Sequence, residues 1–229
     1  MGDARAKLAF VLCAGIGQRL RPLTLHYPKA LLPVAGRPMV FHVLDALRKH
    51  GVKRFLVNLH AHPAVLRRAL DRYAREHRVR FTFLHEKSLF NTGGALRNAK
   101  KHLTEPFWIV NCDFLPFGFS FEAMERTHHR KRAIATLATR PMGPSEPFNP
   151  VGVGRNGKLV RVSQVFGRGG RDHVFLGVHR LEPSVADILP DKKIFPIFSG
   201  MYRPLHSAGL PVYVHSSRPR YAFDLGTLD

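Results

Sequence analysis

Two glycines and two cations near the N-terminus stand in a pattern suited to binding phosphate. Gly15 and Gly17 follow an apolar run, and glycines there let backbone N–H groups approach an anion with no Cβ in the way. Arg19 suits bidentate contact with phosphate oxygens, and Lys29 is a mobile point charge. Together these residues predict a site for a polyphosphate whose leaving group gains negative charge during a reaction.

Two familiar glycine loops do not match this stretch. A dinucleotide-binding fingerprint needs a third glycine where Leu20 stands, and a Walker A loop ends in Gly-Lys-Ser or Gly-Lys-Thr. A bare Gly-x-Gly is also compatible with a tight turn that binds nothing. The interpretation therefore depends on the whole stretch from Leu12 to Pro33.

Asp113 is the first candidate ligand for a metal ion. It follows the apolar run 107–111, which predicts a buried strand that ends near a carboxylate. An isolated aspartate at this place is also compatible with a helix cap. Beside a phosphate loop the metal interpretation is favoured, because a triphosphate needs a hard cation and Mg²⁺ prefers carboxylate, phosphate and water oxygens.

Alternating strands and helices are expected to bring these residues to one edge of a sheet. Apolar runs alternate with stretches of helical period, which predicts an α/β, Rossmann-like, mostly parallel sheet with helices on both faces. Ligands of such sheets bind at the carboxyl ends of the strands, where the glycine loop and Asp113 both fall. The first half is expected to form strands at 8–13, 54–60, 79–85 and 107–111, and helices at 39–50, 64–77 and 93–102.

The second half of the chain has a different pattern. The apolar segment 133–139 precedes a loop with Pro and Gly, 141–150, and then two short strands joined by Asn156-Gly157, a strong hairpin signal. We interpret this hairpin as a lid on the substrate side. The remaining expected elements are a strand at 174–181, a helix at 194–208 and a strand at 212–215. No linker or repeat interrupts the pattern, so we predict one domain, 1–229.

The composition excludes several classes of protein. The 229 residues are 45% hydrophobic and 23% charged, which fits a globular domain rather than a disordered chain. Cys13 and Cys112 each lie in an apolar run, so they are expected to be buried thiols and not disulfide or zinc ligands. The apolar stretch from Leu8 to Ile16 is too short to cross a bilayer and does not end in a signal cleavage site. We predict a cytoplasmic protein without a membrane partner.

The charge balance is strongly basic. Against 36 Lys and Arg stand 16 Asp and Glu, so the net charge is +20 and the surface attracts polyanions. The cations are spread along the chain with no basic tail and no aromatic-rich RNA-binding signature, so nucleic acid is not the expected partner. The histidines show no metal-ligand spacing and are expected on the surface or in the core.

The stretch from Leu12 to Pro33 resembles the signature of the sugar-phosphate nucleotidyltransferases, L-x-A-G-x-G-x-R-L-x-P-L-T followed by P-K-x-L-x-P. The resemblance is to short members such as mannose-1-phosphate guanylyltransferases and N-acetylmuramate-1-phosphate uridylyltransferases. It implies a nucleotide-diphospho-sugar transferase fold with a nucleotide-binding half, 1–139, and a sugar-phosphate-binding half, 140–229. It also implies a Mg²⁺-dependent enzyme that transfers NMP from a nucleoside triphosphate to a sugar 1-phosphate and releases pyrophosphate.

The resemblance assigns a role to each residue of the loop. It implies that the nucleotide phosphates bind around Leu12, Ala14, Gly15 and Gly17. It further implies that Arg19 neutralises the departing pyrophosphate and that Lys29 contacts the reacting phosphates.

Two aspartates are implied as ligands of one Mg²⁺. Asp113 matches the last position of an N-G-D pattern in which Cys112 replaces the glycine, and Asp224 matches a late D-x-G-T motif. A sugar 1-phosphate oxygen is already anionic, so its in-line attack on the α-phosphorus needs no general base.

The segment from His85 to Ala95 resembles the family's base-binding segment and implies base contacts by Glu86, Thr92 and Gly94. A carboxylate at Glu86 only accepts hydrogen bonds, which suits guanine N1–H and N2–H₂ and also uracil N3–H, so both bases stay open. Thr92 is also compatible with an N-cap for the following helix. Asn91 stands where many relatives have glycine.

The sugar-phosphate side departs from the family pattern. Gly152 matches a family glycine, but the Glu-Lys-Pro motif whose lysine binds the sugar phosphate is missing. Either Arg168 or Arg171 replaces that lysine, or the segment from Gln164 to Arg171 is a disordered glycine-rich loop, and we favour the loop.

Two other functions compete with the transferase. One is a cytidylyltransferase that acts on a choline or polyol phosphate with the same loop and acids. The other is a catalytically silent regulatory homologue, against which the intact Arg19, Lys29, Asp113 and Asp224 argue. The expected partners are a nucleoside triphosphate and a sugar 1-phosphate, and a homo-oligomer is compatible with the sequence.

Overall fold

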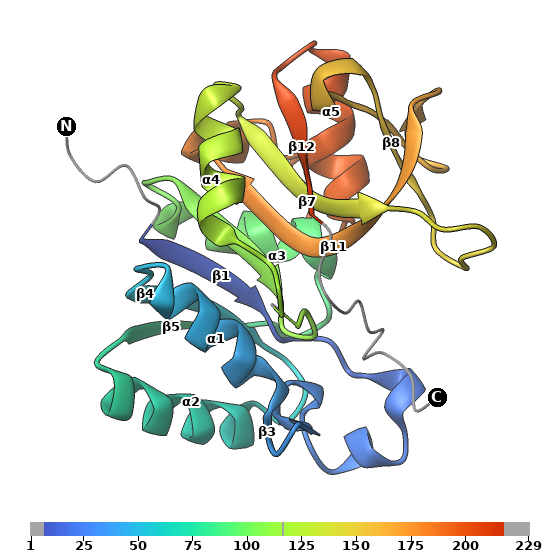
Figure 1. Ribbon diagram of the computed structural model, residues 1–229. Coiled ribbons are helices and arrows are strands. Elements are labelled where there is room, and N and C mark those ends of the chain that lie inside the picture. The colour runs from blue at the N-terminus through green and yellow to red at the C-terminus, as the bar shows by residue number, and fades with distance from the viewer. Residues whose placement is uncertain (1–6, 116, 218–229) are drawn as a thin grey trace.

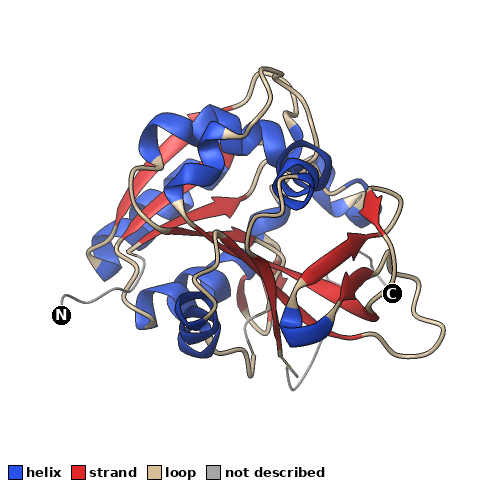
Figure 2. Ribbon diagram, turned by 90° about the horizontal axis from the view of Figure 1, so that it is seen from above, coloured by secondary structure: helices blue, strands red, loops and turns tan. Residues whose placement is uncertain are grey.

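A single mixed sheet runs through the molecule and connects its two halves. The computed structural model describes residues 7–115 and 117–217, so Asp224 lies outside the described residues. Within these ranges the ten-stranded sheet has the order β10-β9-β8-β11-β6-β1-β4-β5, and β7 pairs with both β11 and β12 (Figure 1). Helices cover both faces (Figure 2), which confirms the predicted fold class. In the same ranges, no helix has the length and apolar character needed to cross a membrane.

The N-terminal half forms the parallel part of the sheet. Strands β1, β4, β5 and β6 are all parallel to their neighbours in this part. The predicted strands and helices are confirmed here to within two residues at each end. Their bounds are Leu8–Leu12 for β1, Arg54–Leu59 for β4, Arg80–His85 for β5, Phe107–Asn111 for β6, Met39–Lys49 for α1, Pro63–His77 for α2, and Asn91–Ala99 for α3 with a 3₁₀ turn Lys100–His102.

The C-terminal half joins this sheet through one long strand. β11 (Arg171–Leu181) pairs antiparallel with β6, β7 and β8. The predicted hairpin is confirmed, because β8 and β9 are antiparallel and both Asn156 and Gly157 have positive φ. The other strands are β7 (Ala135–Pro141), β8 (Val151–Val153), β9 (Leu159–Val162), β10 (Phe166–Gly167) and β12 (Val212–Ser216), and a small separate pair is formed by β2 (Pro33–Val34) and β3 (Arg37–Pro38).

The glycine-rich segment is ordered, as the edge strand β10 followed by a crossing turn to β11, so the favoured interpretation as a disordered loop was wrong. β10 pairs with β9, and the chain then turns directly into β11. Gly167, Gly169 and Gly170 all have positive φ. A Cβ on Gly167 would lie 1.9 Å from the Val160 carbonyl oxygen, so this glycine lets β10 pack closely against β9.

Helix α4 (Phe121–Arg130) was not predicted, because polar residues occupy part of its buried face. Glu125 on that face is 3% exposed and accepts a hydrogen bond of 3.0 Å from the Arg180 guanidinium, which is fully buried. The helix expected at 194–208 begins only at Ile197, after Pro196, and continues through a π-turn, Phe198–Tyr202, into α5 (Arg203–Ser207). Buried charged residues interrupt the apolar pattern that would predict the first helix. A proline shifts the start of the second helix further along the chain.

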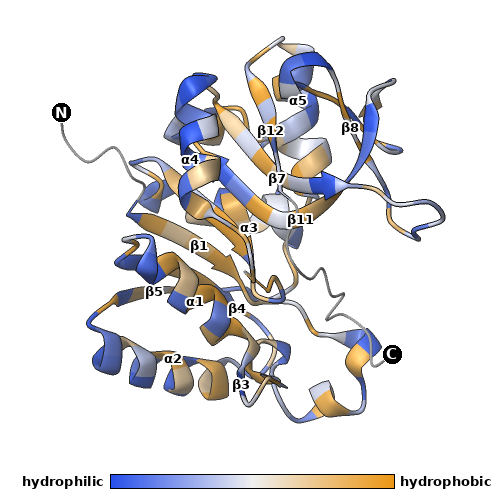
Figure 3. Cartoon of the chain, in the orientation of Figure 1, coloured by the Kyte–Doolittle hydropathy of each residue, from blue (hydrophilic) through white to orange (hydrophobic). Residues whose placement is uncertain are grey.

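The core lies in two layers, one on each face of the sheet. Along β1, Ala9 and Val11 join the layer under α1 and α2, whereas Leu8 and Phe10 join the layer under α3. Both sets are buried, as expected for a central parallel strand. Figure 3 shows the same arrangement: β1 is apolar throughout, and α2 has one polar and one apolar face.

We predict that the buried His179 makes the fold less stable in mild acid. Its Nδ1 lies 2.7 Å from the Tyr202 hydroxyl, and burial lowers the pKa of His179 to about 3. At low pH the unfolded chain therefore binds a proton at His179 more readily than the folded chain does. The contribution of this histidine to the free energy of unfolding is complete above pH 6.5 and is lost as the pH falls from 6.5 toward 3. The expected loss between pH 7 and pH 5 is about 2 kcal/mol from this group.

Urea unfolding at both pH values checks this prediction. In His179→Asn the difference between the two free energies of unfolding should shrink by about the same 2 kcal/mol, even though the variant is less stable at each pH. An unchanged pH difference would show that His179 becomes protonated in the folded protein.

Candidate active site

A cavity of about 240 Å³ opens where the carboxyl ends of β1, β4, β5 and β6 meet the start of α3. We call it the edge cavity. It brings together seven of the residues predicted from the sequence, which lie far apart in the chain: Leu12, Ala14, Gly15, Lys29, Glu86, Thr92 and Asp113. Its other lining residues are Asn58, Leu89, Asn91, Asn111 and Cys112.

The remaining predicted residues lie outside this lining. Arg19 is exposed in the 3₁₀ turn Gln18–Leu20 that follows the loop, and Gly17 packs behind it. Gly94 lines a second cavity behind α3. Gly152, Arg168 and Arg171 belong to the β8 and β10–β11 region, and Asp224 falls outside the described residues.

Gly15 and Gly17 are glycines for different physical reasons. A Cβ on Gly15 would have no atom within 4 Å, so its position faces open space at the cavity. Gly17 has φ +62°, and a Cβ there would lie 2.8 Å from Thr24 Cγ2. The Thr24 hydroxyl also donates a 2.8 Å hydrogen bond to the Gly17 carbonyl. Gly17 therefore shapes the loop, whereas Gly15 leaves room in front of it.

Alanine at these two positions should separate binding from stability. Gly15→Ala should change the free energy of unfolding by less than about 0.5 kcal/mol and yet raise KM for the phosphate-bearing substrate that the sequence predicts, because its methyl group enters the space in front of the loop. Gly17→Ala should destabilise the protein by about 1–3 kcal/mol, because its backbone is left-handed and its Cβ meets Thr24.

Urea unfolding and steady-state kinetics on both variants test the pair. Equal loss of stability in Gly15→Ala and Gly17→Ala would contradict the distinction. So would an unchanged KM in Gly15→Ala.

Lys29 and Asp113 form an ion pair inside the cavity. The Lys29 Nζ lies 2.6 Å from Asp113 Oδ2, and the two side chains are 12% and 32% exposed. Lys29 comes from the 3₁₀ turn Lys29–Leu31 after Pro28, and Asp113 follows β6. A cation and an anion thus meet at the position where the sequence predicted phosphate and metal contacts.

The two cysteines lie at the base of this arrangement as buried free thiols, as predicted. They follow the adjacent parallel strands β1 and β6. A hydrogen bond with the Cys112 thiol and burial both raise the pKa of Cys13 well above its usual value. Cys13 therefore stays a neutral thiol at physiological pH and is a poor nucleophile.

Glu86 joins three strand ends and was expected only as a base contact. Its Oε1 accepts a 2.8 Å hydrogen bond from Asn58 Nδ2, and its Oε2 accepts a 3.0 Å bond from the Phe90 N–H. Asn58 Oδ1 in turn accepts a 2.7 Å bond from the Cys13 N–H. Only 5% of Glu86 is exposed, so this carboxylate holds the wall of the cavity in place.

Asn58 is the residue of this network that sequence reasoning missed. It is a polar side chain, 4% exposed, between the apolar residues Val57 and Leu59 of β4. A buried asparagine near the carboxyl end of a parallel strand needs hydrogen-bond partners, and that requirement was a usable signal.

Thr92 does not cap α3, so that alternative was wrong. Its hydroxyl accepts a 3.1 Å hydrogen bond from the Ile197 N–H and ties α3 to the C-terminal half. No side chain caps the start of α3, where Asn91 has φ +59°. This left-handed backbone accounts for an asparagine at a place where glycine is common, because asparagine tolerates the conformation better than most residues.

The chemistry of the lining fits Mg²⁺ in part. The Asp113 carboxylate and the Asn111 side chain both reach the cavity, and Mg²⁺ prefers such hard oxygens together with phosphates and waters. Within residues 7–115 and 117–217, no three His, Cys, Asp or Glu side chains form a metal-binding group. Of the two described carboxylates that line the cavity, Glu86 already accepts hydrogen bonds from Asn58 and Phe90, so Asp113 is the better placed for a cation, which would need substrate oxygens as well.

Comparisons with known proteins show which families and chains this sequence resembles. Residues 8–165 match the family profile described as "Nucleotidyl transferase". The chain is 30% identical over 196 residues to a protein of Yarrowia lipolytica named "Mannose-1-phosphate guanyltransferase", an alignment that covers 81% of this chain and 54% of the relative. The chain thus spans about half the length of such relatives.

Solved structures share the fold over nearly the whole chain. HddC from Yersinia pseudotuberculosis complexed with GMP-PN has a TM-score of 0.78 at 16% identity, with 97% of this chain and 95% of that chain covered. The inositol-1-phosphate CTP transferase from T. maritima has a TM-score of 0.76 at 18% identity, with 92% and 85% covered.

Proposed function

Because this chain belongs to the nucleotidyl transferase family, we propose that it transfers NMP from a nucleoside triphosphate to a sugar 1-phosphate and releases pyrophosphate. The observation that carries the proposal is the edge cavity, where the glycine loop, Lys29 and Asp113 converge at the carboxyl edge of the sheet. In-line transfer between two phosphates needs positioning and charge stabilisation more than acid–base chemistry, and these residues supply both.

Each residue of the loop has a proposed role in this reaction. The backbone of Leu12, Ala14 and Gly15 faces the nucleotide phosphates, and Arg19 offsets charge on the pyrophosphate. Asp113 would hold Mg²⁺, which when bound polarises the α-phosphate and neutralises charge on its oxygens. Asp224 is proposed as the second carboxylate on the strength of its D-x-G-T motif alone.

Lys29 has two alternative partners in this proposal. In the structure its ammonium pairs with Asp113 Oδ2 at 2.6 Å. A flexible four-carbon stem lets its ammonium turn toward an incoming phosphate without leaving the cavity. The ion pair therefore keeps the carboxylate in place until substrate arrives.

We propose GTP as the nucleotide in preference to UTP. The relative from Yarrowia lipolytica is named as a guanyltransferase, and the HddC structure is described as a complex with GMP-PN. Each Glu86 oxygen already accepts one hydrogen bond, so a guanine edge would use the remaining lone pairs of a carboxylate that cannot move. Gly94 is proposed to contribute indirectly, by holding α3 against the 193–195 segment.

The sugar phosphate is proposed to bind on the side of β8 and β11. Arg168 and Arg171 are both exposed there and are the proposed replacements for the missing lysine. A Cβ on Gly152 would lie 2.3 Å from the Gly169 carbonyl oxygen, so we propose that Gly152 lets the arginine-bearing turn approach β8. A cytoplasmic location completes the proposal.

Pyrophosphate release from a panel of substrates tests the function. GTP, UTP, CTP and ATP should each be paired with mannose 1-phosphate, glucose 1-phosphate, N-acetylmuramate 1-phosphate, inositol 1-phosphate and phosphocholine, with Mg²⁺ present. The proposal expects release with GTP and a hexose 1-phosphate. Release only from CTP with a polyol or choline phosphate would favour a reaction like that of the T. maritima inositol-1-phosphate CTP transferase. No release from any pair would indicate a regulatory homologue.

A further inference from the structure

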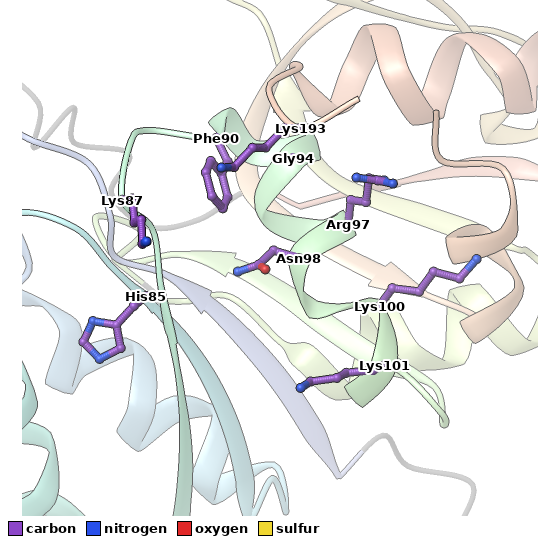
Figure 4. A pocket seen from close by; sticks show the side chains of 9 residues that line it. All are labelled: His85, Lys87, Phe90, Gly94, Arg97, Asn98, Lys100, Lys101 and Lys193. Atoms are coloured by element: carbon purple, nitrogen blue, oxygen red, sulfur yellow. The ribbon is translucent and has the colours of Figure 1, made fainter. Parts of the chain in front are cut away.

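A second, larger cavity lies behind the segment that lines the edge cavity. It has a volume of about 870 Å³ and is formed by the end of β5, by α3 with its 3₁₀ turn, and by the loop that precedes Phe195 (Figure 4). We call it the basic cavity. Its lining residues are His85, Lys87, Phe90, Gly94, Arg97, Asn98, Lys100, Lys101 and Lys193.

The cations of the basic cavity exceed their carboxylate partners. Arg97 pairs with Asp191, and Lys100 lies 3.2 Å from Asp187. In the described part of the chain, no carboxylate forms an ion pair with Lys87, Lys101 or Lys193. Three ammonium groups from three separate segments therefore face one hollow with no counter-charge from these residues.

The arrangement in the cavity differs from a uniformly basic surface. Figure 4 shows Lys87 and His85 on one side and Asn98 and Lys101 on the other, with Phe90 and Lys193 at one end. The Lys193 ammonium lies 4.9 Å from the centre of the Phe90 ring. Like charges gathered in a concave space focus the potential and attract an anion more strongly than the same charges spread over a convex face.

The two cavities share one stretch of backbone. Glu86 and Thr92 line the edge cavity, whereas Lys87, Phe90 and Gly94 line the basic cavity. The Phe90 N–H donates to Glu86 Oε2 at 3.0 Å, so a displacement of Phe90 is transmitted to the carboxylate that supports the nucleotide side.

The opposite wall of the basic cavity is hydrogen-bonded to the segment that contains Phe90 and Gly94. The Phe195 N–H donates to the Phe90 carbonyl at 3.2 Å, and the Gly94 N–H donates to the Phe195 carbonyl at 3.1 Å. A Cβ on Gly94 would lie 2.1 Å from the Lys193 carbonyl oxygen, so the two backbones are in direct contact. A ligand bound between Lys87 and Lys193 would therefore act on both backbone hydrogen bonds of Phe90. One runs from its N–H to Glu86, and the other from the Phe195 N–H to its carbonyl.

We propose that the basic cavity binds a small phosphorylated molecule and that this binding changes nucleotide affinity at the edge cavity through Phe90. The phosphate lies among Lys87, Lys101 and Lys193, where it supplies the missing counter-charge. A small ligand fits a hollow of this size better than a nucleic-acid duplex. This site goes beyond the proposed transferase activity, and its test does not depend on turnover.

Binding is tested on the full chain with ribose 5-phosphate, glycerol 3-phosphate and inorganic phosphate as probes. In ¹H–¹⁵N NMR spectra, the amide signals of Gly94, Arg97 and Lys193 should shift and saturate. The variant K87Q/K101Q/K193Q should bind at least about tenfold more weakly, because its three lysines supply the charge. The control K49Q/K53Q/K158Q removes three exposed lysines elsewhere and should weaken binding by less than about twofold.

The outcomes of the binding test are distinct. Shifts confined to the edge cavity, or equal weakening in both triple variants, would overturn the site. If inorganic phosphate binds as tightly as the two esters, the ligand is free phosphate. The basic cavity would then still be an anion site, but the proposed organic ligand would be wrong. A twelve-nucleotide RNA that shifts the same amides while all three probes fail would replace the small molecule by nucleic acid and overturn the proposal.

Coupling is measured separately from binding. The dissociation constant for GTP should change by about threefold or more when the bound probe is saturating, a coupling of the usual allosteric size. The same change should disappear in K87Q/K101Q/K193Q and in the single variant Lys193→Gln. A dissociation constant for GTP that does not respond to a bound probe would overturn the regulatory role. If the protein bound no nucleotide at all, the proposed function would fail while the first test still decided the site.

Discussion

Replacing Asp113 with asparagine is expected to lower the rate of pyrophosphate release by about a thousandfold, because the carboxylate that we propose would hold Mg²⁺ beside the reacting phosphate loses its charge. Asp113 lines the edge cavity, follows the largely buried strand β6, and lies 2.6 Å from the Lys29 ammonium. Asparagine keeps the shape of the side chain and removes only its charge. The comparison therefore isolates the electrostatic role of the carboxylate.

The fold should survive this change. Asp113 is 32% exposed, and an ion pair that is partly open to solvent contributes about 1 kcal/mol or less after screening. The midpoint of urea unfolding should thus stay close to that of the parent protein. Asp71→Asn on α2, 42% exposed, is the matched control and should leave turnover unchanged. Turnover in Asp113→Asn within tenfold of the parent protein would remove Asp113 from the metal site.

The elements of the fold were predictable wherever one physical signal dominated. In β1 and β6 nearly every residue is apolar and buried on one of two faces, so the sequence pattern is unambiguous. Helix α4 was missed because Glu125 and His128 occupy its buried face. Their partners, Arg180 and Glu182, come from more than fifty residues away, and local periodicity cannot reveal such pairs.

The candidate site was predictable as a set of positions but not as a set of contacts. Motif spacing and the rule that ligands bind at the carboxyl edge of parallel sheets predicted that Gly15, Lys29 and Asp113 lie together. All three line the same cavity. The Lys29–Asp113 ion pair depends on side-chain rotamers across 84 residues of sequence, so no spacing rule predicts it. The anchoring of Glu86 by Asn58 and Phe90 likewise appears only when β4 and β5 are paired.

Replacing Lys29 with methionine should also reduce turnover by about a hundredfold to a thousandfold, because the ammonium that we propose turns toward the reacting phosphates is lost. The lysine stem is largely buried, since the side chain is 12% exposed, and methionine retains most of that apolar contact. Lys29→Arg should recover only part of the activity, because a planar guanidinium does not reproduce a mobile point charge. Lys49→Met on α1 is the control for loss of an exposed lysine.

The double variant Lys29→Met/Asp113→Asn tests whether the two residues act together. If Lys29 moves from the carboxylate to the phosphate during the reaction, the two losses in kcat should be far from additive, because each single change already disables the same charge arrangement. Single-turnover rates for the parent, both single variants and the double variant give this coupling directly. Fully additive losses would mean that the 2.6 Å ion pair only stabilises the cavity wall and that Lys29 and Asp113 act on the substrate independently.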